Sequence, residues 1–176
     1  MVTGAAVASA PAYAAAQGLC VSNVASICAR DTGIGNTVDQ WPQDISGDVH
    51  QQWSRTYLGK VCNSGGCCWP FKCGNGFNNV YDGNSVWAFS SDAYSEFACL
   101  TDGGATMYLE QCQFSGGSQA DDEFVWTSVG VLVNVAATNA TGAPQYLNGT
   151  GNYQALSAYN PGVGEPDYDW VMRNGS

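Results

Sequence analysis

The chain carries eight cysteines, and four of them fall between positions 62 and 73. Four clustered thiols can hold a zinc ion as thiolates or form two disulfides. The cluster lacks a C-x₂-C pair and the chain has one histidine, so disulfides are favoured over zinc. Adjacent Cys67 and Cys68 are expected to pair outward rather than with each other. The predicted disulfide framework comprises Cys20, Cys28, Cys62, Cys67, Cys68, Cys73, Cys99 and Cys112.

Side chains suited to acid–base catalysis are few. His50 is the only histidine, so a Ser-His-Asp or Cys-His mechanism would have to use it. Two carboxylates suffice for glycoside hydrolysis, and acidic pairs occur at 121–123 and at 44 and 48. Acidic clusters in a chain of net charge −10 are usually solvated surface, however, and nothing places two acids across one cleft. We therefore expect a non-catalytic protein that uses no metal or other cofactor.

The charge balance restricts the partners of this chain. It has 15 acidic residues against 5 basic ones, and the basic residues are scattered. Proteins that bind nucleic acid or an anionic membrane surface need clustered Lys and Arg. No stretch is long and apolar enough to span a bilayer. The composition therefore argues against nucleic-acid binding and against membrane insertion.

The N-terminus agrees in part with secretion. Residues 1–16 are small and apolar and end in Ala14-Ala15-Ala16, like the tail of a signal peptide. The positively charged start of such a peptide is missing, because Arg30 is the first basic residue. We interpret 1–16 as a signal-peptide remnant and 17–176 as one mature domain of a secreted protein. The alternative is that the first residues belong to the mature chain.

Short runs of alternating apolar residues must form the elements that position these side chains. Such runs occur at 80–81, 86–89, 106–109 and 129–133, each bounded by Gly, Asn, Asp or Pro. This pattern is typical of strands and turns, and helical periodicity is hard to find. The sequence therefore predicts an all-β barrel or sandwich.

Three alternating stretches end on a tryptophan, at Trp53, Trp126 and Trp170. A repeat of this length implies that each unit cannot bury its apolar face alone, so the copies share one core. We place the repeats at about 19–61, 80–128 and 129–172. A Cys-rich insertion at 62–77 separates the first copy from the second.

The first copy carries a recognisable motif. Gln51-Gln52-Trp53, with Gln40-Trp41-Pro42 ahead of it, matches the Q-x-W motif of the ricin-type β-trefoil lectins. The chain resembles that family over roughly 19–172. Copies two and three keep the tryptophan but have Phe124 and Tyr168 in place of the glutamine.

The resemblance implies a β-trefoil of three pseudo-repeats. In that fold, indoles at equivalent positions fill the bottom of a small closed barrel, and closure removes free strand edges. Trp53, Trp126 and Trp170 are therefore expected in the core rather than in contact with a ligand. The resemblance also implies a Cys99–Cys112 bridge, while Cys20 and Cys28 would pair locally or reach the insertion.

The resemblance further implies a sugar site in copy one. The family uses an acid soon after a cysteine, a platform aromatic, and an amide near the Q-x-W; copy one offers Asp31, Trp41, His50 and Gln51. Such a set stacks an aromatic face on a pyranose and clamps two hydroxyls. Asp31 lies one residue later than the family's acid, and Arg30 occupies the expected place. That offset turns the carboxylate away unless a bulge restores it.

The other two copies match this set less well. Copy three offers Asn148, Tyr159 and Asp167, with an amide and an acid exchanged. Copy two has Glu110 where the platform aromatic should be and is expected to be silent. The alternative for all three copies is that these polar groups only satisfy turns.

The insertion adds Trp69-Pro70-Phe71, which the family pattern does not supply. Two aromatic residues in a stapled loop can bind a protein partner through Trp69 and Phe71, or fold over the barrel mouth as a lid. We therefore expect a secreted, non-catalytic binding module with carbohydrate as the leading ligand. The alternative is an adaptor subunit of a larger secreted assembly, such as a bacterial toxin complex, with a secreted protein as partner.

Overall fold

The computed structural model describes residues 16–22, 27–63, 67–94, 98–104, 106–113, 121–149, 154–160 and 169–175. Their strands follow the chain in three groups of four. The first group is β1 (Gln17–Val21), β2 (Ile27–Asp31), β3 (Val38–Pro42) and β4 (Trp53–Lys60). The second group is β5 (Ser85–Ser91), β6 (Ala98–Asp102), β7 (Met107–Gln111) and β8 (Phe124–Trp126). The third group is β9 (Leu132–Asn134), β10 (Tyr146–Asn148), β11 (Ser157–Tyr159) and β12 (Trp170–Asn174). The described residues also form three short helices: η1 (Val49–Gln51) within the first group, α1 (Phe77–Val80) between the first and second groups, and α2 (Val135–Thr141) within the third.

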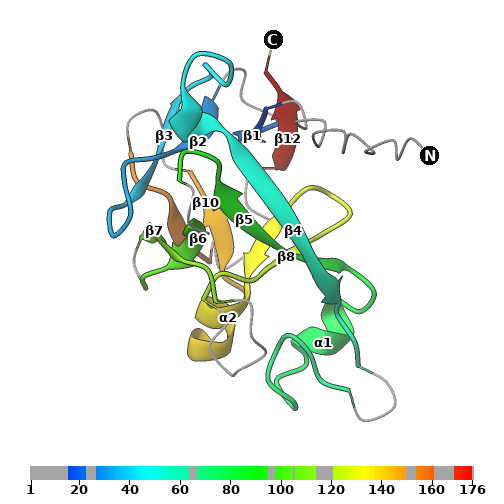
Figure 1. Ribbon diagram of the computed structural model, residues 1–176. Coiled ribbons are helices and arrows are strands. Elements are labelled where there is room, and N and C mark those ends of the chain that lie inside the picture. Colours follow the sequence, from blue (N-terminus) through cyan, green and yellow to red (C-terminus); the bar gives the residue numbers. More distant parts are fainter. Residues whose placement is uncertain are drawn as a thin grey trace, which may run out of the picture.

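The pairing of the strands repeats from group to group. The second and third strands of each group form an antiparallel hairpin, β2–β3, β6–β7 and β10–β11. The last strand of each group pairs with the first strand of the next, as β4–β5, β8–β9 and β12–β1. A barrel of first and fourth strands with three hairpins is a β-trefoil, as predicted. In Figure 1 the β2–β3 and β6–β7 hairpins lie on the left and β4 crosses to the lower right.

The inner core fills the barrel at the start of the last strand of each group, which we call the closing strand. Trp53 and Trp170 are each the first residue of such a strand, and both are buried. The indole N–H of Trp53 donates to the carbonyl of Ala29 at 3.0 Å. The indole N–H of Trp170 donates to the carbonyl of Leu147 at 2.9 Å. In copy one and in copy three, this bond joins the closing strand to the second strand of that copy. Copies one and three therefore have the same internal frame.

Copy two differs from the prediction at this position. The first residue of its closing strand is Phe124, which is fully buried and lies 5.8 Å from Phe89 between ring centroids. Phe124 pairs with Asn134 of the next strand, as Trp170 pairs with Val21. Trp126, expected in the core, instead lies two residues further along and is half-buried. The strand pairing selects the core position, and in copy two it selects the phenylalanine.

A second apolar cluster lies on the outer face of the barrel. Val86, Val125 and Val133 are paired across β5, β8 and β9 and are buried. Aromatic residues of the insertion pack against them, with Phe71 at the centre of that cover. Its ring centroid lies 5.8 Å from that of Phe77 and 5.6 Å from that of Tyr81. The insertion therefore covers the outside of the barrel and contributes a core of its own.

Four disulfides cross-link the chain, one within copy one, one within copy two and two within the insertion. The bonds are Cys20–Cys28, Cys62–Cys67, Cys68–Cys73 and Cys99–Cys112. The Cys99–Cys112 bridge and the outward pairing of Cys67 and Cys68 are confirmed, and Cys20 pairs locally with Cys28. The predicted signal-peptide remnant, apart from residue 16, lies outside the described residues. In the described part of the chain, no helix is long and apolar enough to cross a membrane.

Candidate functional site

The β2–β3 hairpin separates two residues that the sequence predicted to act together. Asp31 pairs with Val38, and Trp41 pairs with Cys28, in an unbroken antiparallel register. Successive side chains of a strand point to opposite faces, so Asp31 and Trp41 lie on opposite faces of the hairpin. No bulge interrupts this hairpin to correct the one-residue offset. Asp31 faces inward and is fully buried, whereas Trp41 is half-buried on the outer face.

The buried carboxylate of Asp31 is a hydrogen-bonding centre. Its Oδ2 accepts a bond of 2.5 Å from the Ser91 hydroxyl, and its Oδ1 lies 2.9 Å from Nδ1 of His50. Partial burial, followed by the charge and hydrogen bonding of Asp31, raises the pKa of Tyr94. A buried carboxylate needs such partners, because an unpaired one is costly to bury. Asp31 thus positions His50, whose side chain is 37 % exposed, instead of meeting a ligand itself.

The glutamine of the Q-x-W motif also has a structural role. Gln51 is buried, and its side-chain oxygen accepts a 2.8 Å bond from the Asp44 amide. Its side-chain nitrogen donates a 2.8 Å bond to the carbonyl of Pro42. These bonds tie the end of β3 to the loop that leads to η1. Because both ends of the amide are engaged, Gln51 holds the loop rather than a ligand.

The outer face of the hairpin brings together a different group of side chains. The Arg30 guanidinium carbon lies 4.5 Å from the centroid of the Trp41 ring. Arg30 Nε donates to Asp48 Oδ2 at 2.6 Å, and the two side chains are 24 % and 21 % exposed. Asp48 Oδ1 in turn accepts from the backbone N–H of His50 at 3.0 Å and caps η1. We call Arg30, Trp41 and Asp48 the copy-one surface. His50 adjoins it through its backbone N–H, while its ring lies against Asp31.

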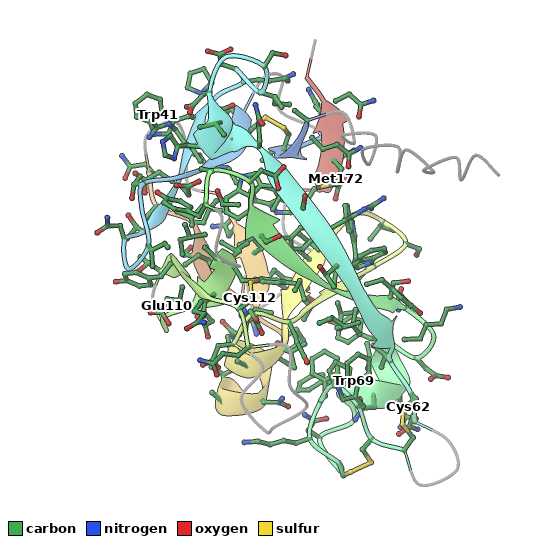
Figure 2. All side chains as sticks on the ribbon, in the orientation of Figure 1. Trp41, Cys62, Trp69, Glu110, Cys112 and Met172 are labelled. Carbon is green, nitrogen blue, oxygen red and sulfur yellow. A yellow bond between two sulfur atoms is a disulfide. The ribbon has the colours of Figure 1, made fainter. Side chains whose placement is uncertain are left out.

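This surface combines an aromatic ring with donors and an acceptor for hydroxyl groups. Cation–π contact and the ion pair hold the guanidinium in place, so the indole and the carboxylate are pre-positioned. The sequence singled out Trp41 and His50 as candidates, but not Arg30 and Asp48. The alternation of side chains carried that signal, because Arg30 precedes Asp31 and so shares the face of Trp41. Figure 2 labels Trp41 at the upper left, at the β2–β3 hairpin.

In copy three the structure describes only part of the predicted set. Asn148 is half-buried in β10 and pairs with Ser157. Tyr159 pairs with Tyr146 in β11, the same place in the repeat that Trp41 occupies in β3. The Tyr159 side chain and the whole of Asp167 lie outside the described residues. In copy two Glu110 pairs with Cys99 and is exposed at the equivalent place.

The residues expected to contact a protein partner pack inward. Phe71 is 1 % exposed in the outer cluster. Trp69 is half-buried against Gly59, where an added Cβ would lie 3.0 Å from the Trp69 ring. The insertion therefore does not present the pair as a free hot spot, and it covers the outer wall of the barrel rather than its mouth.

The acidic run at 121–123 is not the solvated surface that its charge suggested. Asp122 and Glu123 are only 2 % and 5 % exposed. Burial, reinforced by the charge of Asp122, raises the pKa of Glu123 to about 7. Burial is likewise the main cause that raises the pKa values of Asp122 and Asp102. Within the described residues, no group of three or more His, Cys, Asp and Glu side chains could hold a metal ion.

The comparisons with known proteins agree with the fold. No family model matches the chain, and no curated protein is similar in sequence. Among solved structures, the chain is similar to the β-trefoil lectin of the Vibrio vulnificus hemolysin/cytolysin with N-acetyl-D-lactosamine bound, at a TM-score of 0.58 and 17% identity. The match covers 93% of this chain and 97% of that chain. At this level of identity the similarity establishes the β-trefoil.

Proposed function

We propose that this chain is a secreted, non-catalytic carbohydrate-binding module whose sugar site is the copy-one surface. The observation that carries the proposal is the half-exposed Trp41 ring, held beside the Arg30–Asp48 ion pair at the start of η1. Protein sugar sites need an aromatic face for the C–H side of a pyranose and polar groups for its hydroxyls. All of these groups occur together here.

The geometry suggests a separate role in sugar binding for each side chain. Arg30 lies over one face of the Trp41 indole, so a pyranose would stack on the opposite face. The Asp48 carboxylate would accept from one hydroxyl, and His50 would donate to or accept from a neighbouring one. Asp31 would act indirectly by fixing the orientation of the His50 ring. The family's usual acid is thus replaced by an acid from the η1 cap.

Two further observations support this proposal. The structurally similar β-trefoil is a lectin that binds N-acetyl-D-lactosamine, which makes a glycan the first ligand class to test. The four disulfides fit an oxidising, extracellular location. A separate adaptor function is not proposed for the insertion, because Trp69 and Phe71 pack against the barrel.

The test is a glycan array that includes N-acetyl-D-lactosamine, followed by titration of the best ligand. We expect saturable binding that Trp41→Ala abolishes and Trp41→Phe weakens only partly, because a smaller ring still stacks. Glu110→Ala is the matched control, since Glu110 has the equivalent position in copy two. Binding that survives Trp41→Ala at full affinity would remove the copy-one surface from the account.

A further inference from the structure

A second cluster of aromatic and basic side chains lies at the end of the barrel beyond the inner core. Arg55 is two residues after Trp53 on β4 and pairs with the buried Phe89. The equivalent positions in the other copies, two residues after the first residue of the closing strand, are Trp126 and Met172. Arg55 therefore belongs to the ring of side chains at the mouth of the barrel, where the other two members are apolar.

Aromatic rings hold Arg55 from two sides. Its guanidinium carbon lies 4.7 Å from the centroid of the Trp87 ring and 5.5 Å from that of Trp126. Tyr57 meets Trp87 edge-on, with ring centroids 5.2 Å apart, and is 52% exposed. Both indoles are half-buried, and Arg55 itself is exposed. We call Arg55, Tyr57, Trp87 and Trp126 the barrel-mouth cluster.

Arg55 differs from the other two arginines in its polar contacts. Arg30 forms an ion pair with Asp48, and Arg173 donates to the side chain of Gln43 and to two backbone carbonyls. Among the described residues, Arg55 has no hydrogen bond or ion pair and contacts the faces of two indoles. Stacking fixes the plane of a guanidinium while its N–H edge stays open to an oxyanion. Within the described part of the chain, the N–H edge of Arg55 is thus oriented and has no acceptor.

We propose that the barrel-mouth cluster is a second ligand site and that it binds an acidic sugar through its carboxylate. A guanidinium edge recognises a carboxylate with two parallel hydrogen bonds, a geometry that Lys cannot supply. The half-exposed ring of Tyr57 offers a face for the C–H side of the same pyranose. This site differs from the copy-one surface, because its cation has no acidic partner among the described residues, whereas Arg30 is neutralised by Asp48.

The charge of the protein does not oppose this assignment at short range. The chain has a net charge of −10, which repels an anionic ligand at a distance. That repulsion is screened beyond about 8 Å at physiological ionic strength, whereas a paired guanidinium and carboxylate lie in direct contact. Packing alone also does not call for an arginine here, since the equivalent positions are occupied by Trp126 and Met172.

The experiment compares D-galacturonate with its uncharged methyl ester and with acetate. Binding is followed through the indole N–H signals of Trp87 and Trp126 in NMR spectra. We expect saturable shifts with galacturonate and affinity at least about tenfold lower for the ester and for acetate, because each lacks one half of the recognition. Arg55→Gln should abolish binding, and Arg55→Lys should lower the affinity about tenfold or more.

Trp41→Ala separates this proposal from the function proposed above. It should leave galacturonate binding unchanged, while Arg55→Gln should leave binding at the copy-one surface unchanged. Thermal melts of each variant establish that it is folded. Equal shifts with galacturonate and its methyl ester, equal shifts with acetate, or full binding by folded Arg55→Gln would each overturn the proposal. The absence of any shift at these two indoles would overturn it as well.

Discussion

Asp31 and Trp41 project from opposite faces of the β2–β3 hairpin, although both were expected to meet one ligand. The register pairs Asp31 with Val38 and Trp41 with Cys28, so one residue enters the interior and the other remains at the surface. Asp31 therefore forms hydrogen bonds with Ser91 and His50 in the interior, whereas the half-buried Trp41 ring lies at the surface.

Asp31→Asn should destabilise the protein by about 2–3 kcal/mol, because a buried carboxylate loses charge-assisted bonds to Ser91 and His50. Asp39→Asn is the control, since the half-exposed Asp39 of β3 accepts a 3.0 Å bond from the hydroxyl of Thr37, two residues before it. We expect the control to cost less than about 1 kcal/mol. Urea denaturation measures both free energies of unfolding. Equal losses would show that Asp31 is not the centre of this network.

Phe124→Ala should cost about 3–5 kcal/mol, because it empties the fully buried place that Trp53 and Trp170 fill in the other copies. Trp126→Ala should cost clearly less, although it removes a larger side chain, because Trp126 is half-buried. The difference in chemical denaturation midpoint ranks the two variants. If Trp126→Ala were the more damaging change, the internal frame would rest on the three tryptophans after all.

Phe71→Ala should destabilise the outer cluster by about 3–5 kcal/mol, since the ring is 1 % exposed between the insertion and the barrel wall. Val80→Ala, on the exposed side of α1, should change the free energy of unfolding by less than about 0.5 kcal/mol. Thermal unfolding distinguishes them. A Phe71→Ala protein of unchanged stability would restore the insertion as a candidate surface for a partner.

Glu123 makes the stability depend on pH. Its pKa is raised from 4.5 to about 7 in the folded protein, so the folded state holds the proton more tightly than the unfolded chain. The contribution of Glu123 to the free energy of unfolding should therefore be greatest below pH 4.5 and should fall as the pH rises towards about 7. Glu123→Gln should flatten that decline and stabilise the protein at pH 8.

The matched control for this pH effect is Glu110→Gln, which removes one negative charge from an exposed position on β7. It tests whether loss of net charge alone is sufficient. Denaturation curves at pH 5 and pH 8 should change their separation for Glu123→Gln and hardly at all for Glu110→Gln. The same small change in both variants would show that burial of Glu123 is not responsible.

The fold could be predicted from the sequence because the packing of the core requires the same residue types at the same places in each repeat. The Trp53 and Trp170 positions, the alternating runs between them and the Cys99–Cys112 bridge all report on one repeated unit. The assignment of Trp126 to the core failed for a physical reason. Two residues of one strand that face the same way, Phe124 and Trp126, are equivalent in pattern, and only the pairing with β9 selects between them.

The candidate site could be predicted from the sequence only in part. The motif and its resemblance to the lectins singled out Trp41 and His50 as candidates, but the ion pair of Arg30 with Asp48 joins β2 to the η1 cap, a contact that no local pattern records. The inward packing of Phe71 likewise depends on valines of three strands that follow it in the chain. The burial of Glu123 was hidden because an acidic run normally indicates surface.

The most direct measurement of the central claim follows the indole N–H signals of the protein by NMR during titration with the best glycan from the array. The signal of Trp41 should shift most and saturate, and Asp48→Asn should weaken the interaction by about tenfold or more, since one clamp on a hydroxyl is lost. Trp53 and Trp170, buried in the barrel, should hardly respond. Saturable binding that leaves the Trp41 signal unmoved would contradict the account.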